Sequence, residues 1–463
     1  MATTATSRMH PSRATGPLVT SVDAAIEQIG VGRFQWRLLF VNGLVWAADA
    51  MEVLLAGFVL PAITRLWALT PTQAGLISTV TFAGMFIGAW AWGIIADRAG
   101  RRAVFVWTVL LGAVFSLLAA LSPNLMVLLI TRFLTGLAIG GTLPVDYAVM
   151  SEFLPARQRG RFLVYLESFW SLGTIVVALL AWLLIPRFPA DGWRWLLVVS
   201  ALPGVLGFWI RRNVPESPRY LLVSGREAEA RRVLEQVAGD NGKTINVGPL
   251  QAEARSGKSS TAAIWSGALI SRTLLLSIVW FGLSLGYYGI FTWLPSIFVQ
   301  QGFTFVRSYE YLILLALAQV PGYALAAFLV DKIGRRWTVA LFLLVSAISS
   351  FLFAIAATPG LIVGSAMLLS FALLGAWGGL DAFTPELYPT EVRATGMGWA
   401  SAMARAAGIL APTIGGLLLG VSLPLALGVY AAFFVVAGVA ALLIRTETAG
   451  RVLMDVVGEP LRQ

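Results

Sequence analysis

The stretch FALLGAWGGLDAFTPELYPTEVRATGMG, residues 371–398, begins as an apolar helix and carries a tryptophan and an aspartate inside that run. An aspartate in such a helix costs about 2.5–3.5 kcal/mol at the centre of a bilayer. Trp377 lies four residues before Asp381, so the ring and the carboxylate share one face of the helix. An acid beside an indole on one face indicates a binding site. The Pro-Glu-Leu-Tyr-Pro loop that follows indicates a hinge at the membrane surface.

The rest of the chain has the same apolar character. Of its 463 residues, 58% are hydrophobic and 12% are charged, and that charged share is about half of what soluble domains carry. A spanning helix needs about 18 or more apolar residues. Apolar runs fall at 36–63, 73–96, 103–121, 125–150, 163–185, 193–210, 273–299, 308–330, 337–357, 360–384, 396–419 and 423–444. The sequence predicts an all-α membrane protein with twelve transmembrane helices in two pseudo-symmetric bundles of six.

Lysines and arginines gather in alternate loops between these runs, at 98–102, 157–161, 332–336 and 393. Cationic loops stay on the cytoplasmic side, so we expect both termini in the cytoplasm. The predicted parts are a tail (1–32), a first bundle (33–212), a linker with a short amphipathic helix (213–271), a second bundle (272–446) and a tail (447–463). The net charge of +10 belongs to these loops and does not indicate a nucleic-acid partner; membrane lipid is the expected partner.

An internal repeat with a spacing of 234 residues relates the two halves. Asp97-Arg-Ala-Gly-Arg-Arg102 recurs as Asp331-Lys-Ile-Gly-Arg-Arg336, and the same spacing connects Glu152 with Glu386. The halves are therefore predicted to be parallel repeats about an axis along the membrane normal. Transporters with this plan bind substrate between the halves and rock them alternately.

The repeated acids and arginines predict an ion-pair latch that closes the cytoplasmic side while the protein faces outward. Arginines that only anchor the loops to lipid headgroups are the alternative. The recurrence of pairs rather than lone cations favours the latch. Its predicted members are Asp97, Arg101, Arg102, Asp146, Glu152, Arg159, Asp331, Arg335, Arg336, Glu386 and Arg393.

Several motifs carry a resemblance to a known family. The D-x-x-G-R-R loops, PESPRYLL at 215–222 and PELYPTEVRATG at 385–396 resemble the major facilitator superfamily and its sugar-porter-like branch, over about residues 33–455. ADAMEV at 48–53, SEFL at 151–154 and GYYG at 286–289 are similar to the synaptic vesicle glycoprotein group and the bacterial niacin transporters. The vesicle proteins carry a large insertion after the seventh helix, whereas only residues 300–307 intervene here. A compact, monomeric transporter of a bacterial inner membrane is therefore the nearer analogue.

This resemblance implies that Trp170, Tyr287, Trp377 and Asp381 line a central pocket. Tyr288 is the weaker candidate, because neighbouring positions of a helix face different sides. Trp46, Trp280 and Trp293 are expected in the core.

Charged residues inside the spans are the remaining candidates. Asp49 and Glu52 lie three apart on one face of the first helix and predict proton coupling or a substrate contact. Alternatively, they could be structural partners of Arg132 or Arg405. Arg405, nine residues into the eleventh helix, could bind a substrate carboxylate or neutralise Asp381. The single histidine is His10, in the tail, so any proton relay must use carboxylates.

The polar content of the spans constrains the substrate. A sugar site needs many amides and hydroxyls, and only Asn42 and Gln319 supply amides within the spans. Aromatic rings with one cation suit a small planar aromatic acid, and we expect proton-coupled transport of nicotinate. An organic-cation or aromatic-amine carrier and a non-transporting binding protein are the alternatives. The chain shows no nucleophile–base pairing, metal cluster or phosphate loop, so we expect no enzyme activity and no cofactor.

Overall fold

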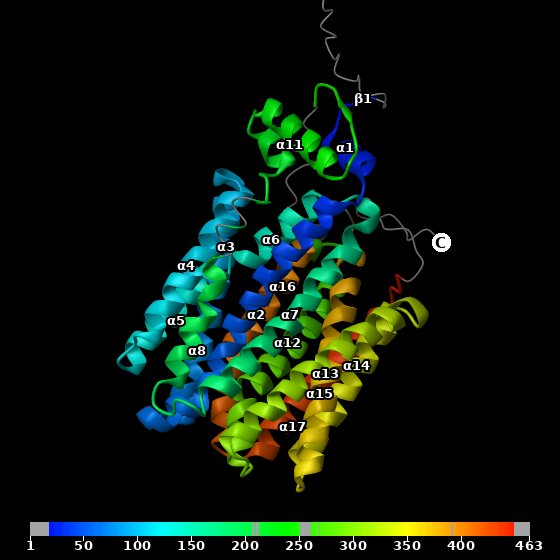
Figure 1. Cartoon of the computed structure of the whole chain (residues 1–463). Helices are drawn as coiled ribbons and strands as arrows, with labels where there is room; N and C mark the ends of the chain where they lie inside the picture. Colours follow the sequence, from blue (N-terminus) through cyan, green and yellow to red (C-terminus); the bar gives the residue numbers. More distant parts are fainter. Residues whose placement is uncertain are drawn as a thin grey trace, which may run out of the picture.

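The computed structural model describes residues 18–205, 209, 213–250, 261–267, 269–389 and 392–448. The first half contains α2 (Arg33–Trp67), α3 (Pro71–Ala99), α4 (Arg101–Ala120), α5 (Leu125–Ile139), α6 (Thr142–Glu152), α7 (Ala156–Leu184), α8 (Gly192–Ser200) and η1 (Leu202–Val205). The second half contains α12 (Leu269–Gln300), α13 (Phe305–Lys332), α14 (Arg335–Ala354), α15 (Pro359–Glu386), α16 (Arg393–Leu419) and α17 (Leu423–Leu443). Figure 1 shows these helices running side by side along one bundle axis.

The predicted all-α membrane fold is confirmed. Within the described part of the chain, ten helices are long and apolar enough to cross a membrane. The fourth and sixth predicted spans are interrupted: the fourth consists of α5 and α6, and α8 with η1 begins the sixth. The break at Gly140 and Gly141 has a packing cause. A β-carbon at Gly140 would lie 2.3 Å from the Met85 carbonyl oxygen, and one at Gly141 would lie 2.5 Å from the Trp92 side chain.

Small residues bring the helices into close contact along the same seam. A β-carbon at Gly136 would lie 2.0 Å from the Thr81 carbonyl oxygen, and one at Gly88 would lie 2.2 Å from that of Leu137. The Trp92 indole N–H donates to the same Leu137 carbonyl at 2.9 Å. Between membrane helices, glycines at such contacts let backbones approach and gain dispersion energy. These contacts fix how far each helix is rotated and hence which side chains face the centre.

Both D-x-x-G-R-R loops lie at one end of the bundle, which we call the Arg-rich end. Between the halves, α3 packs on α16, α2 on α12 and α7 on α13. Several of the closest of these contacts lie at the other end of the bundle. The Thr79 hydroxyl lies 2.8 Å from that of Thr413, and the Tyr309 hydroxyl donates to the Phe58 carbonyl at 2.8 Å. A β-carbon at Gly57 would lie 2.7 Å from the Thr292 carbonyl oxygen. The halves are therefore tightly joined at the end opposite the Arg-rich end.

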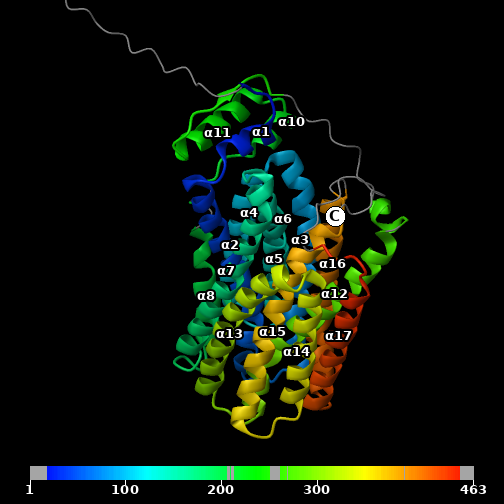
Figure 2. The same cartoon turned by 90° about the vertical axis from the view of Figure 1, so that its right-hand side faces the viewer.

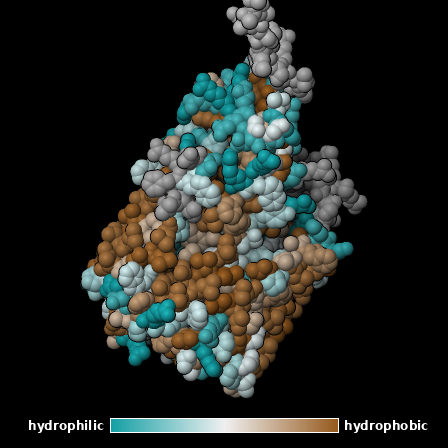
Figure 3. Space-filling model, viewed as in Figure 1, coloured by the Kyte–Doolittle hydropathy of each residue, from teal (hydrophilic) through white to brown (hydrophobic). Residues whose placement is uncertain are grey.

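A small polar unit lies over the Arg-rich end of the first half (Figures 1 and 2). It consists of α1 (Val22–Ile29), α10 (Pro218–Val223), α11 (Glu227–Asp240) and a parallel pairing of β1 (Leu18–Val19) with β2 (Asn246–Val247). The buried face of α11, with Leu234 and Val237, packs against α1. The amphipathic linker helix thus covers its apolar face with the N-terminal helix. Figure 3 shows this hydrophilic unit above an apolar surface that covers the flank of the bundle.

Candidate functional site

Four of the predicted pocket residues meet between the two halves. Trp170 on α7 donates its indole N–H to the Tyr287 hydroxyl on α12 at 2.8 Å. The Trp377 ring centroid on α15 lies 6.2 Å from that of Tyr287 and 6.4 Å from that of Tyr288. We call Trp170, Tyr287, Tyr288 and Trp377 the aromatic cluster. The hydrogen bond joins the halves within the spans, and the ring contacts join the three members of the second half.

Glycines on either side of the tyrosines explain their placement. A β-carbon at Gly286 would lie 2.2 Å from the Phe434 ring, and one at Gly289 would lie 2.3 Å from the Tyr430 ring. The glycine face of α12 is therefore pressed against α17, and the tyrosines turn toward the centre. Tyr288 reaches Trp377 as Tyr287 does, because long aromatic side chains at adjacent positions can border the same space.

Two tryptophans expected in the core also border the cluster. Trp46 and Trp280 are each only 6% exposed, which fits the core expectation. Their rings nevertheless lie 5.4 Å from Trp170 and 5.3 Å from Trp377, respectively. The two positions are one repeat apart, at 46 and 280, so the repeat itself was the signal that both halves place an indole here.

Asp381 lies one turn beyond Trp377, and an acid that the sequence analysis did not identify faces it. This acid is Glu167 on α7, and its charge interacts with that of Asp381 from the other half. Tyr323 on α13 lies near both carboxylates and packs over Gly378, whose added β-carbon would be 2.9 Å from the Tyr323 ring. The signal for Glu167 was its spacing, because it lies three residues before Trp170 and so shares that residue's face.

Glu52 has a definite partner among those left open by the sequence. The Arg132 Nη1 donates to the Glu52 carboxylate at 2.8 Å, and its Nη2 donates to the Glu52 backbone carbonyl at 2.7 Å. The two side chains are 1% (Arg132) and 6% (Glu52) exposed. Removing one member of such a buried pair leaves an uncompensated charge and costs about 3–5 kcal/mol.

Asp49 lies one turn before Glu52 and is 6% exposed. A cavity of about 20 Å³ borders both carboxylates, between α2, α4, α5 and the start of the sixth span. A volume of about 10–15 Å³ is enough to hold one water molecule. These two acids therefore have room for a single water beside them.

Asp146, which was predicted as a latch residue, is buried inside the bundle. It is 0% exposed, and within the described chain both of its carboxylate oxygens lack a hydrogen-bond partner. Its charged neighbours include Asp49 and Glu167. A buried carboxylate without a cation is costly in its charged form. The structure thus groups Asp146 with the acids inside the spans.

Arg405 extends from α16 toward the first half. It is 9% exposed, and its Nη1 donates to the backbone carbonyl of Ser401 at 3.3 Å and also to the Ser401 hydroxyl. Gly408, one turn further along α16, packs on Phe82, whose ring centroid lies 4.5 Å from that of Tyr288. The Arg405 Nε has no acceptor among the described residues. The guanidinium thus keeps donor capacity next to the aromatic cluster.

At the Arg-rich end the repeated ion pairs form within each half. Arg101 Nε lies 3.5 Å from the Glu152 carboxylate, and the Arg335 guanidinium holds Glu386 by two hydrogen bonds of 2.9 and 3.2 Å. Arg335 also lies 3.5 Å from Asp331. The side chain of Asp97 lies outside the described residues. Four of the predicted latch residues, Arg101 with Glu152 and Arg335 with Glu386, thus lie in matching pairs, one in each half.

The glycine of each D-x-x-G-R-R loop allows an acid to cap the next helix. Gly100 and Gly334 have φ of 99° and 95°, values that favour glycine. Glu216 accepts from the backbone N–H groups of Arg101 (3.0 Å) and Arg102 (3.3 Å), and Glu447 accepts in the same way from those of Arg335 (2.9 Å) and Arg336 (3.3 Å). Carboxylates at helix N-termini satisfy free donors and complement the helix dipole.

Arg159 and Arg393 bind the preceding helix ends. Arg159 Nη2 donates to the Leu154 carbonyl at 3.3 Å, and Arg393 Nε donates to the Pro385 carbonyl at 2.9 Å. Each arginine thus ties the start of one helix to the end of the helix before it. This contact connects any rocking of α7 or α16 to the ion pair beside it.

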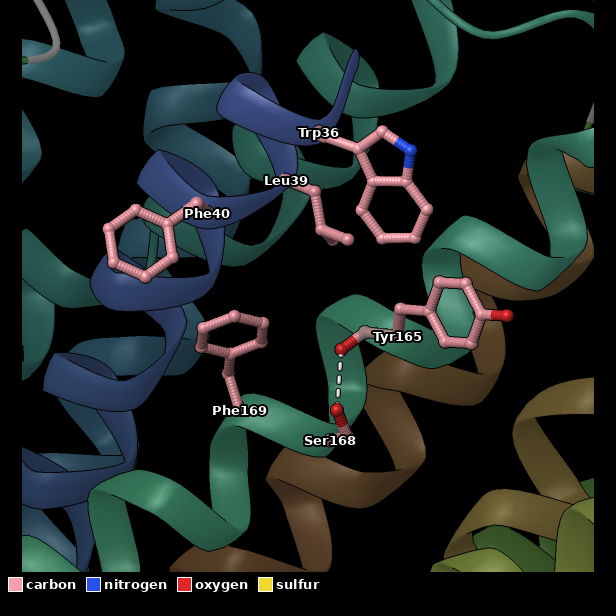
Figure 4. Close-up of a pocket in the computed structure, with 6 residues that line it drawn as sticks. All are labelled: Trp36, Leu39, Phe40, Tyr165, Ser168 and Phe169. Atoms are coloured by element: carbon pink, nitrogen blue, oxygen red, sulfur yellow. Dashed lines mark hydrogen bonds between the residues drawn. The ribbon is translucent and has the colours of Figure 1, made fainter. Parts of the chain in front are cut away.

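A surface groove of about 380 Å³ lies apart from the aromatic cluster, between α2 and α7. Figure 4 shows its six lining residues, with the Ser168 hydroxyl donating to the Tyr165 backbone carbonyl at 2.7 Å. Trp36 and Phe40 are each about half exposed. The groove is lined by Trp36, Leu39, Phe40, Tyr165, Ser168 and Phe169. The groove is lined by residues of the first half alone, whereas the aromatic cluster takes side chains from both halves and lies one turn from Asp381.

Comparison with known proteins identifies the family. The sugar (and other) transporter family matches residues 59–457. The chain belongs to this family. It is a multi-pass membrane transporter of a small molecule and not an enzyme. Among this family's characterised members, a niacin transporter of Acinetobacter baylyi is 44% identical over 84% of this chain and 88% of its own.

Two further proteins are similar to this chain, one in sequence and one in structure. Organic cation/carnitine transporter 7 of Arabidopsis thaliana is 35% identical over 94% of this chain and 96% of its own. The xylose transporter XylE of E. coli, in a partially occluded inward-open conformation, shares the fold with a TM-score of 0.72. That match is 18% identical and covers 89% of this chain and 100% of that one. The predicted resemblance to the transporter superfamily is thereby confirmed.

Proposed function

We propose that this protein is a secondary active transporter that moves a small planar aromatic acid, nicotinate first, by alternating access. The observation that carries this proposal is the aromatic cluster, which joins side chains of both halves beside a buried guanidinium. A site shared by two rocking halves can be exposed to one side of the membrane at a time. The similarity to a niacin transporter supports nicotinate as the first substrate to test.

The cluster fits an aromatic carboxylate chemically. Indole and phenol rings offer edge and face contacts worth about 0.5–1.5 kcal/mol each beyond area burial. Arg405 retains a free donor next to Tyr288. A carboxylate hydrogen-bonded to a guanidinium contributes roughly twice as much as a neutral pair. We infer that the substrate ring lies against Trp377 and Tyr288, with its carboxylate toward Arg405.

Proton coupling is assigned to the acids of the first half. Asp49, Glu52 and Asp146 lie close together, and only Glu52 has a cation at hydrogen-bond distance among the described residues, so the acids outnumber their partners. Binding or release of one proton there changes the cost of the buried charges by several kcal/mol. Such a change is large enough to bias two conformations of the bundle.

The Arg-rich end is proposed to face the cytoplasm of a bacterium, as the distribution of cationic loops favours. The pairs Arg101–Glu152 and Arg335–Glu386, one within each half, would then hold together the helix ends that form the cytoplasmic gate. In the alternate conformation, the contacts that join the halves at the opposite end, such as Thr79 with Thr413, must separate. We propose that one copy of the chain carries out this cycle.

The test is counterflow of labelled nicotinate into liposomes that contain the purified protein. Trp377→Ala and Arg405→Gln should each abolish uptake, because one removes a stacking surface and the other the counter-charge. Trp90→Ala and Arg307→Gln are matched controls, because both side chains are exposed: Trp90 lies on α3, and Arg307 lies in the first turn of α13. Absence of wild-type counterflow would reject nicotinate as the substrate.

An organic-cation carrier is the second candidate. The buried or half-buried acids Asp49, Glu52, Asp146, Glu167 and Asp381 outnumber the buried cations Arg132 and Arg405 inside the spans. One relative is named as an organic cation/carnitine transporter. Competition by a quaternary amine, with none by nicotinate, would select this candidate. Binding of nicotinate without any counterflow would instead indicate a non-transporting binding protein.

A further inference from the structure

Glu167 and Asp381 form a carboxyl pair built from both halves of the molecule. Glu167 lies on α7 one turn before Trp170, and Asp381 lies on α15 one turn after Trp377. The two helices are in contact, and both tryptophans contact Tyr287, so the two carboxyl groups lie near each other between the halves. Neither side chain is sealed, because both retain partial exposure. Each lies on the face of its helix that carries a tryptophan of the aromatic cluster. The pair therefore borders the space in which the proposed substrate lies.

The site has two chemically different sides. On one side, the Tyr288 ring lies 6.4 Å from that of Trp377, which is one turn from Asp381. On the other side, it lies 4.5 Å from the Phe82 ring, which packs on Gly408, one turn after Arg405. Tyr288 thus stands between a guanidinium and a carboxyl pair, so a ligand stacked on it meets a cation at one edge and two acids at another.

Two buried donors independently indicate a ligand. In the described structure, Arg405 Nε has no acceptor although the residue is 9% exposed, and the Trp377 indole N–H likewise has none. Buried donors without partners are uncommon and costly, about 1–3 kcal/mol each. A ligand that carries acceptors, such as a carboxylate, would satisfy them.

We propose that Glu167 is a specificity-determining residue that, together with Asp381, binds the ring nitrogen of a heteroaromatic carboxylate. The inference rests on the proposed function and narrows its substrate class to pyridine-type acids. The nitrogen either shares one proton with the carboxyl pair or carries a fixed positive charge between the two acids. The ligand carboxylate points to Arg405.

The physical reason is the cost of leaving the pair without a cation. Two carboxyl groups brought together in a low-dielectric site repel each other when both are charged. A ring nitrogen with a positive charge or a shared proton relieves this repulsion and joins the two halves. A benzene ring of the same shape presents a C–H instead and leaves the pair unsatisfied. Sites built for a polar partner reject the analogue that lacks it.

The experiment compares three ligands that share a carboxylate: nicotinate, benzoate and N-methylpyridinium-3-carboxylate. Binding to the purified protein is measured by the shift of its thermal unfolding, and competition by counterflow of labelled nicotinate. Wild type should bind both nitrogen-containing ligands about ten- to a hundredfold more tightly than benzoate. Glu167→Gln should bring this preference to within about threefold, whereas Glu167→Asp should retain part of it.

Glu235→Gln serves as the control, because this acid is exposed and lies on α11, in the polar unit outside the bundle. An unchanged preference in Glu167→Gln, or a wild type that binds benzoate as well as nicotinate, would overturn the inference. The binding measurement keeps the two proposals separate. A wild type that selects the nitrogen ligands without transporting nicotinate supports the role of Glu167 and rejects the transport assignment.

Discussion

The pair of Glu52 and Arg132 gives the prediction that the structure constrains most closely. Arg132→Gln removes the guanidinium and leaves the Glu52 carboxylate with 6% exposure and no cation at 2.8 Å. The expected destabilisation is about 3–5 kcal/mol, the cost of an unpaired buried charge. Glu52→Gln leaves the arginine unpaired and should cost a similar amount. The arginine, however, keeps its 2.7 Å bond to the Glu52 backbone carbonyl, so this variant should lie at the lower end.

The double variant Glu52→Gln/Arg132→Gln decides whether charge is the cause. It contains no buried charge at this site, and two amides can hydrogen-bond to each other. It should therefore recover most of the loss and show a coupling energy of about 2–3 kcal/mol relative to additive behaviour. Thermal unfolding of the four proteins in one detergent provides the measurement.

The effects of these substitutions on transport should differ from their effects on stability, and transport is measured on the same four proteins. Glu52→Gln should retain nicotinate counterflow, which needs no net proton movement, but lose accumulation driven by an imposed pH gradient. Additive destabilisation in the double variant would refute the charge argument. Unchanged gradient-driven accumulation in Glu52→Gln would exclude Glu52 as a coupling group.

The remaining predictions concern the Arg-rich end and the aromatic cluster. Gly100→Ala should destabilise the protein by about 2–4 kcal/mol, because φ of 99° is strained for alanine and the new β-carbon would lie 2.3 Å from the Glu216 carboxylate. Gly225→Ala is the control: its φ is 74° but the space around it is open, so it should show only the cost of the backbone strain. Equal losses of stability in the two variants would contradict the capping role of Glu216. Tyr287→Phe should cost about 1–3 kcal/mol in thermal unfolding, because it leaves the buried Trp170 N–H without its acceptor. Trp170→Phe should cost more, because it also shrinks a buried ring, and the double variant should cost no more than Trp170→Phe alone; additive losses would show that the hydrogen bond contributes nothing.

The sequence alone determined the features that depend on local composition. The length of the apolar runs determined the membrane-spanning helices, since a bilayer has one thickness and its interior offers no partner to backbone groups. The 234-residue repeat determined that Gly100 and Gly334 occupy equivalent positions in the two D-x-x-G-R-R loops. The residues of the aromatic cluster could be named because the resemblance assigned Trp170, Tyr287 and Trp377 to one cavity.

Only the tertiary structure decided which charges face one another. Glu52 could have met Arg132 or Arg405, and the choice depends on how far α2 and α5 are rotated and shifted along their axes. Glycine contacts such as Gly136 against Thr81 help to set those rotations. Glu167 lies more than two hundred residues from Asp381 in the chain, and their meeting follows from the packing of the two halves. Spacing along a helix determines a shared face, but only packing between helices determines what that face meets.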